Sequence, residues 1–96
     1  MRLEVRLLSG AQYSMNWYLY IVECSDKSLY TGVTIDLNRR VFEHNNSNLG
    51  AKSVAGKRPV TLVYSELHNN RTEVLKREIE IKGWSRKKKL ELIGIG

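Results

Sequence analysis

The sequence predicts an α+β domain in which a three-stranded, mainly antiparallel sheet is flanked by helices. Three stretches are rich in the aromatic and β-branched residues that favour strands: residues 17–23, 28–33 and 60–66. Three others carry apolar residues at helical spacing: residues 35–46, 72–83 and 86–92. The chain order is therefore β-β-α-β-α-α, and we expect the strands to lie in the sheet in that same order.

Length and charge limit the protein to a few classes. The 96 residues are enough for one domain and too few for two cores. No apolar run approaches the roughly 20 residues that span a bilayer, and Glu4 and Arg6 interrupt the block that a signal peptide needs. A single cysteine, Cys24, cannot form an internal disulfide, which fits a reducing cytosol. The net charge of +6 favours a polyanionic partner such as nucleic acid.

Residues 1–16 have two readings. Leu3, Val5 and Leu7 alternate with polar residues at the strand period of two, and the stretch from Ser9 breaks the alternation. The segment is either an extra strand at the sheet edge or a leader before the domain, and we favour the leader. The domain itself is expected to span residues 17–93.

A hairpin is expected over residues 17–33. The polar residues 25–28 form its turn. A two-residue turn would place Tyr20 and Tyr30 on opposite faces of the sheet, whereas a turn one residue longer or shorter, or a bulge, would align them. The sequence leaves the register open. Gly32 suits either a close backbone approach to a bound molecule or a simple bend into the next helix.

The first helix places two polar side chains beside its apolar ones. At about 100° per residue, Arg40 and His44 fall within roughly 60° of the direction shared by Leu37 and Val41. They therefore point toward the sheet or along its edge. Because arginine is almost never buried unpaired, Arg40 needs an anion from the protein or from a ligand.

A long flexible connection is expected between the first helix and the third strand. It carries three cations, Lys52, Lys57 and Arg58. A loop of this length in a small domain is usually functional or disordered. We interpret it as a contact for backbone phosphates, with a plain solvated loop as the alternative.

The second helix carries an acid on its apolar side. The apolar arc is expected to contain Val74, Leu75, Ile79 and Ile81. Glu78 projects into the middle of this arc, one turn before Lys82. An acid on an apolar face is costly unless it is paired or bound to a metal. Glu78 is therefore either half of an ion pair with Lys82 or a functional carboxylate. His68, in the turn before this helix, is expected at the surface.

The last helix begins with a run of cations that extends the basic surface. The run consists of Arg86, Lys87, Lys88 and Lys89. Its side chains are expected to face outward, opposite Leu90 and Ile93. A solvated basic face and a nucleic-acid contact both fit this pattern.

Several of these residues together resemble the motifs of the GIY-YIG nuclease superfamily. The matching residues are Tyr18-Leu19-Tyr20, Tyr30-Thr31-Gly32, Arg40 and His44. The sequence is most similar to the small stand-alone branch, the YhbQ-like proteins, and the resemblance covers about residues 17–90. It departs from the motif names at Tyr18 and Leu19, which stand for Gly and Ile, and at Thr31, which stands for Ile. The family's element order agrees with the order expected here.

The resemblance implies a role for each candidate residue in phosphodiester hydrolysis. Tyr20 would take the proton from the attacking water, assisted by His44, and Tyr30 would orient the phosphate or the water. Arg40 would clamp the scissile phosphate, and Glu78 would anchor a metal ion. The polar side chain, often asparagine, that some relatives place near the metal has no identified counterpart in this sequence.

The implied cofactor is a single Mg²⁺ or Mn²⁺ held by Glu78, waters and the phosphate, because the chain lacks the clustered carboxylates of a two-metal site. Zinc is disfavoured for want of a Cys/His ligand set. Gly32 would let the backbone approach the substrate, and Lys82 would join the basic residues that contact DNA. The implied function is an endonuclease acting on branched, damaged or single-stranded DNA. The alternative is a non-cleaving nucleic-acid-binding module with the same fold.

Overall fold

Residues 16–46 and 50–94 are described by the computed structural model of the protein. The helices and strands follow in the order β1 (Trp17–Glu23), β2 (Leu29–Thr34), α1 (Leu37–Asn46), α2 (Lys52–Ala55), β3 (Thr61–His68), α3 (Arg71–Lys82) and α4 (Arg86–Ile93). The α+β class is confirmed. The question of a leader or an extra strand at residues 1–16 concerns a segment that lies, except for its last residue, outside the described part of the chain.

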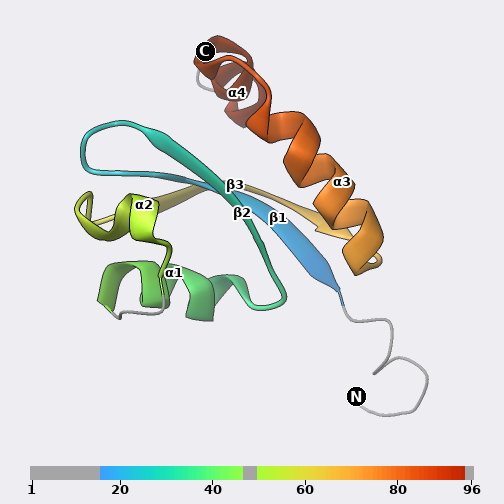
Figure 1. The fold of residues 1–96 in the computed structure, drawn as a ribbon, viewed down its shortest axis with the longest axis horizontal. Helices are drawn as coiled ribbons and strands as arrows, with labels where there is room; N and C mark the ends of the chain where they lie inside the picture. Colours follow the sequence, from blue (N-terminus) through green and yellow to red (C-terminus); the bar gives the residue numbers. More distant parts are fainter. Residues whose placement is uncertain (1–15, 47–49, 95–96) are drawn as a thin grey trace.

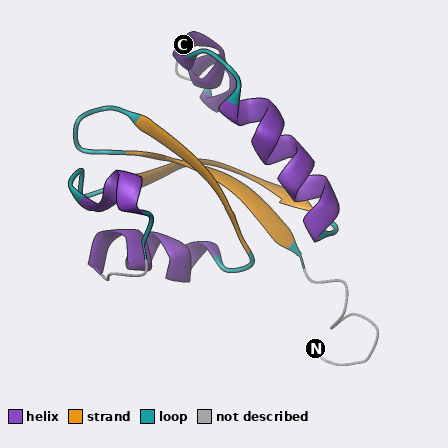
Figure 2. Ribbon diagram, in the orientation of Figure 1, coloured by secondary structure: helices purple, strands orange, loops and turns teal. Residues whose placement is uncertain are grey.

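The three strands form one antiparallel sheet with β1 in the middle (Figure 2). The spatial order is β2-β1-β3, so the expectation that the strands lie in chain order is wrong. The helical segments between β2 and β3 carry the chain across the sheet to the free edge of β1. Four consecutive residues of the central strand, Leu19 to Val22, are buried, as expected for a strand that is covered on both faces.

The turn between β1 and β2 settles the register of the two tyrosines. The backbone N–H of Cys24 donates to the carbonyl of Ser28 at 2.8 Å, which leaves three residues in the loop. Lys27, the last of them, has the left-handed φ of 73° that is common in three-residue hairpin loops. Tyr20 therefore pairs with Gly32, and Tyr30 pairs with Val22. Paired residues share a face, so both phenols lie on the same side of the sheet.

Two layers of helices cover the sheet, α1 and α2 on one face and α3 with α4 on the other (Figure 1). Side chains at even positions of β1 pack under the first layer, and those at odd positions pack under the second. The first core contains Tyr20, Val22, Cys24, Val54 and Val60. The second contains Leu19, Ile21, Val74 and Ile81. The helices α1 and α3 thus lie on opposite faces of the sheet.

The connection between α1 and β3 is held in place where the structure describes it, rather than being the flexible loop that we expected. It contains the short helix α2. The side chain of Asn45 accepts from the backbone N–H of Val60 at 2.7 Å and donates to its carbonyl at 3.1 Å. The N–H of Ser25 donates to the carbonyl of Lys57 at 2.9 Å, which ties the connection to the hairpin turn.

The buried side of α3 differs from the expected arc at one residue. Val74 and Ile81 are fully buried, but Ile79 is 74% exposed. Residues 74, 78 and 81 follow the spacing of a single helical stripe, which Ile79 leaves by one residue. Within the described residues, no helix is both long and apolar enough to cross a membrane.

Candidate active site

Three aromatic rings meet on the face of the sheet beneath α1. Tyr20, in the middle of β1, is 1% exposed, and its hydroxyl lies 2.7 Å from Nε2 of His44. The ring of Tyr30 lies 6.3 Å from that of Tyr20 and 5.3 Å from that of His44, measured between centroids. The register of β1 and β2 therefore places both tyrosines on the face that His44 covers, and the three rings form one cluster.

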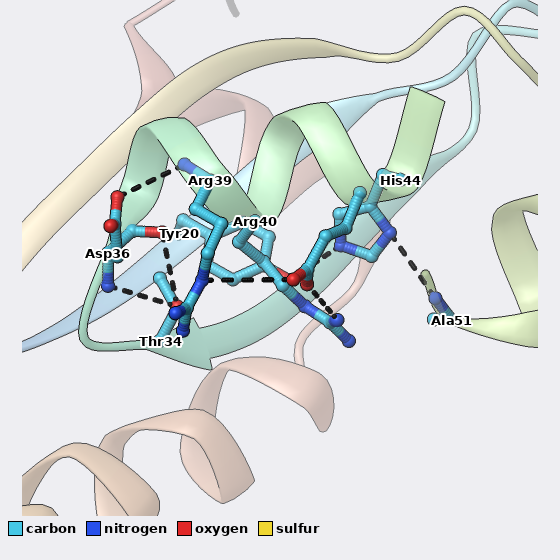
Figure 3. A network of polar contacts seen from close by, with 8 residues as sticks. Tyr20, Thr34, Asp36, Arg39, Arg40, His44 and Ala51 are labelled. Carbon is cyan, nitrogen blue, oxygen red and sulfur yellow. Dashed lines mark hydrogen bonds and ion pairs between the residues drawn. The ribbon is translucent and has the colours of Figure 1, made fainter. Parts of the chain in front are cut away.

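His44 is held between the sheet and the residues that follow α1. It is fully buried, and its Nδ1 accepts a hydrogen bond from the backbone N–H of Ala51 at 3.4 Å. Because a backbone N–H can only donate, the proton of the neutral ring lies on Nε2 and is directed at the Tyr20 oxygen (Figure 3). Burial, together with the positive charge of Arg40, lowers the pKa of His44, so the ring is neutral at pH 7.

Arg40 lies one turn before His44 on α1, and its side chain is 26% exposed. One of its terminal nitrogens, Nη1, donates to Oε1 of Glu43 at 3.0 Å. The guanidinium also hydrogen-bonds with the side chain of Tyr20. The protein thus supplies the anion that Arg40 needs, which is Glu43. The Arg40 guanidinium also reaches the Tyr20 phenol.

The phenol of Tyr20 is protonated at neutral pH. Burial raises the pKa of Tyr20 to about 12, against the lowering effect of the hydrogen bond from Arg40. The negative charge of Glu78 also raises this pKa, although Glu78 lies on α3. Its effect is smaller than those of burial, Arg40 and Tyr30.

Glu78 occupies the buried stripe of α3 between Val74 and Ile81. Its side chain is only 17% exposed, and its Oε2 lies 3.2 Å from Nζ of Lys82. The lysine is half exposed, so it reaches the carboxylate from the solvent side. The ion pair expected as the simple alternative is present. It does not exclude a metal, because an exposed lysine can swing away at little cost.

Gly32 faces Tyr20 across the two strands. A Cβ atom at position 32 would lie 2.6 Å from the Tyr20 hydroxyl oxygen and 2.7 Å from Cζ. The glycine thus makes room for the phenol. This gives Gly32 a role within the protein, beside the approach to substrate that we predicted.

The predicted nucleic-acid-binding cations fall into two groups. Lys57 lies 3.6 Å from the Asp26 carboxylate, and Nε of Arg58 donates to the carbonyl of His44 at 2.6 Å. These two hold the loop against its neighbours, and Lys82 holds Glu78. The remaining cations are exposed or nearly so and lie on α2 and α4: Lys52, Arg86, Lys87, Lys88 and Lys89. Among them, Nζ of Lys88 lies over the ring of Trp84, 4.3 Å from its centroid.

Comparisons with known proteins identify the family. The model of the GIY-YIG catalytic domain matches residues 16–91 of this chain. The chain belongs to the GIY-YIG family. A UPF0213 protein of Staphylococcus saprophyticus is 53% identical over 79 residues, which cover 82% of this chain and 95% of that protein. A UPF0213 protein of Syntrophus aciditrophicus is 51% identical over 76 residues, covering 79% of this chain and 87% of that protein.

Two solved structures share the GIY-YIG chain's fold. The solution NMR structure of the UPF0213 protein BH0048 from Bacillus halodurans is 42% identical, with a TM-score of 0.55, and covers 84% of this chain and 85% of its own. The solution NMR structure of the protein EF2693 from E. faecalis is 37% identical, with a TM-score of 0.59. The match covers 82% of this chain and 83% of that chain. These likenesses confirm the resemblance to a small stand-alone branch of a nuclease family.

Some residues around the site have no recognisable signal in the sequence. Ala51 contributes only a backbone N–H. Gly50 is needed because a Cβ there would lie 2.8 Å from Cα of His44, a contact made by segments that the sequence does not show to be adjacent. Glu43 could have been found as a carboxylate three residues after Arg40 and four after Arg39 on one helix.

Proposed function

We propose that the protein is a metal-dependent endonuclease that hydrolyses phosphodiester bonds in DNA, with branched, damaged or single-stranded DNA as its substrates. One observation carries the proposal. A buried phenol is hydrogen-bonded by both an imidazole and a guanidinium, and it lies within the field of a half-buried carboxylate from another helix. Hydrolysis needs these elements: a proton acceptor for water, a cation for the phosphate and an anchor for a metal.

Arg40 is proposed to bind the scissile phosphate. Its guanidinium stays charged at every relevant pH, and its planar donors match phosphate oxygens. Glu43 accepts from Nη1 and Tyr20 also hydrogen-bonds with the guanidinium. A guanidinium carries five N–H donors, so it can serve more than one acceptor. Placed there, Arg40 would stabilise the charge that builds up on the phosphate during attack. Tyr30, whose ring lies beside both Tyr20 and His44, would orient the phosphate or the water.

Tyr20 is proposed as the group that removes the proton from water. With a pKa of about 12 it holds its own proton in the resting site. Its oxygen receives hydrogen bonds from His44 and Arg40, and both bonds favour the phenolate. Since Glu78 raises this pKa, neutralising the carboxylate lowers it. An ion that balances the charge of Glu78 would therefore make the Tyr20 phenol easier to deprotonate.

The residues present fit a hard cation bound mainly through water and phosphate oxygens. Glu78 supplies one carboxylate, and among the described residues no group of three or more His, Cys, Asp or Glu side chains could hold an ion by itself. Mg²⁺ or Mn²⁺ accepts such a site, since Mg²⁺ usually keeps several waters and is held by one or two carboxylates plus phosphates. The ion would supply positive charge at the phosphate and the leaving oxygen.

The DNA backbone is proposed to run along α4. The exposed cations of this helix follow α3, which carries Glu78, so one strand can contact both. The residues that already contact the protein, Lys57, Arg58 and Lys82, are expected to contribute less to DNA binding than the exposed cations. The full set of predicted contacts is Lys52, Lys57, Arg58, Lys82, Arg86, Lys87, Lys88 and Lys89. A domain of this size has little surface for reading bases, so we expect recognition of structure rather than sequence.

A cleavage assay tests the proposal. Labelled branched, single-stranded and linear duplex DNA are incubated with Mg²⁺ and wild-type protein, or with Tyr20→Phe, Arg40→Ala or Glu78→Gln. We expect the wild type to nick at least one substrate and each variant to lose roughly 100-fold or more in rate. Tyr18→Phe on the same strand and Glu80→Gln on the same helix are matched controls that should retain activity. Equal nicking by all proteins would mark a contaminant and end the proposal.

A non-cleaving nucleic-acid-binding module is the second candidate. It is favoured by the 3.2 Å contact between Lys82 and Glu78, because the lysine already balances the carboxylate that the metal would use. Under this alternative, binding follows the basic residues and is unaffected by Mg²⁺. Tight binding by a wild type that cleaves none of the substrates would select it.

A further inference from the structure

Glu43 contacts two arginines of the same helix. Its Oε1 accepts from Nη1 of Arg40 at 3.0 Å, and its Oε2 lies 3.7 Å from Nε of Arg39. All three residues lie on α1, with Glu43 four residues after Arg39 and three after Arg40. The Glu43 side chain is 19% exposed and that of Arg39 is 61% exposed. The carboxylate therefore holds one arginine inside the site and is itself held from the solvent side by the other.

The Arg40 guanidinium is engaged at two points. Glu43 takes Nη1, and Tyr20 receives a hydrogen bond from the same group. A long arginine side chain has many rotamers, and fixing it costs conformational entropy whenever it must act. Two anchors on different elements, a helix and the central strand, define both the position and the plane of the guanidinium. The orientation exists before any substrate arrives.

We propose that Glu43 is a positioning residue, which holds Arg40 in the orientation that contacts Tyr20 and receives the phosphate. The inference rests on the proposed function for its catalytic consequence. Its structural half, that Glu43 immobilises Arg40, stands by itself. Arg39 completes the arrangement, since it occupies the second carboxylate oxygen and limits rotation of the carboxylate away from Arg40.

A second pair in the same protein separates positioning from an ordinary surface ion pair. Arg77 and Glu80 on α3 have the same spacing and the same 3.0 Å distance between Nη1 and Oε1. Glu80 is 54% exposed, however, and Arg77 is also held by Glu66 at 2.9 Å. Removing Glu80 therefore leaves its arginine anchored. Removing Glu43 takes away the carboxylate that holds Nη1 of Arg40.

A carboxylate beside Arg40 has a competing effect, because it also repels phosphate. The two effects are distinguishable by sign. If repulsion dominates, removal of the charge tightens DNA binding and lowers KM without lowering kcat. If positioning dominates, removal lowers kcat, since a misplaced clamp acts most strongly on the transition state.

The test measures catalysis and Arg40 mobility in the same set of variants. Glu43→Ala removes the acceptor, Glu43→Gln keeps an acceptor oxygen without the charge, and Glu80→Ala is the matched control. We expect Glu43→Ala to lower kcat roughly 10- to 100-fold with KM changed by less than about threefold. Glu43→Gln should keep kcat within about fivefold, and Glu80→Ala should match the wild type. An unchanged thermal midpoint for Glu43→Ala excludes misfolding as the cause.

The second readout does not depend on activity. The ¹⁵N relaxation of the Arg40 Nε–H group reports the order of the guanidinium side chain. We expect it to be ordered in the wild type and in Glu80→Ala, and mobile in Glu43→Ala. An ordered Arg40 in Glu43→Ala overturns the inference, and so does a lowered KM with unchanged kcat. If the wild type cleaves nothing, the proposed function fails, and the relaxation data still decide whether Glu43 positions Arg40.

Discussion

Replacing Gly32 by alanine tests the geometry of the site through a single methyl group. The new Cβ would lie 2.6 Å from the Tyr20 hydroxyl oxygen, 2.7 Å from Cζ and 3.0 Å from Cε2. Ordinary contact begins near 3.4 Å, so the hydroxyl has to retreat by about 0.8 Å. The backbone at position 32 does not add to the cost, because Gly32 does not have a positive φ. Among the described residues, the glycine with a positive φ is Gly94.

The ring of Tyr20 has little room for this movement. It is 1% exposed, and its neighbours are the rings of Tyr30 and His44. Overpacking of this kind costs about 1–3 kcal/mol. Loss of the 2.7 Å hydrogen bond to His44 adds about 1 kcal/mol. We therefore expect Gly32→Ala to lower the free energy of unfolding by about 2–4 kcal/mol, and to lower the cleavage rate roughly 100-fold.

Urea denaturation followed by tryptophan fluorescence measures the stability change, and a double-mutant cycle assigns it to the ring. In a Tyr20→Leu background the phenol is gone, so Gly32→Ala should cost less than about 1 kcal/mol. An equal cost in both backgrounds would refute the proposed clash. So would a Gly32→Ala protein that is as stable and as active as the wild type.

Three further predictions concern stability and binding. Thr31 is 3% exposed, and its hydroxyl has no hydrogen-bond partner among the described residues, so Thr31→Val should stabilise the fold by about 1 kcal/mol in urea denaturation. A destabilised variant would reveal a partner for the hydroxyl. Because burial lowers the pKa of His44 below 6.5, the stability that its neutral form contributes is complete above pH 6.5 and is lost as the pH falls through the lowered value. Urea midpoints at pH 7.5 and pH 5.5 should therefore differ less in His44→Gln than in the wild type, and an equal difference would contradict the assignment. Finally, Lys87→Gln with Lys89→Gln should reduce the salt slope of duplex-DNA binding by about 2; an unchanged slope would place the DNA elsewhere.

The strands, the long helices and the buried side of each helix could largely be predicted, because each depends on local pattern. The periodicity around Leu37 and Val41 is enough to turn His44 inward, where it is fully buried. Glu78 was predictable for the same reason, since its position on the stripe of Val74 and Ile81 follows from helical spacing alone.

The features that the sequence could not supply depend on contacts between distant segments. The register of Tyr20 and Tyr30 depends on whether the hairpin loop has two residues or three, and polar residues 25–28 allow both. The strand order depends on which edge of β1 receives β3, which no local pattern records. The exposure of Ile79 shows the limit of a binary pattern, because an apolar residue at the margin of a stripe can face either way.

Paramagnetic NMR with Mn²⁺ tests the central claim, that groups from α1, β1 and α3 share one metal and phosphate site. Mn²⁺ broadens the signals of nearby nuclei. In the presence of a short DNA strand, we predict selective broadening of the ring signals of Tyr20 and Tyr30 in the wild type, and its loss in Glu78→Gln. Broadening centred elsewhere on the surface, or unchanged in Glu78→Gln, would contradict the account.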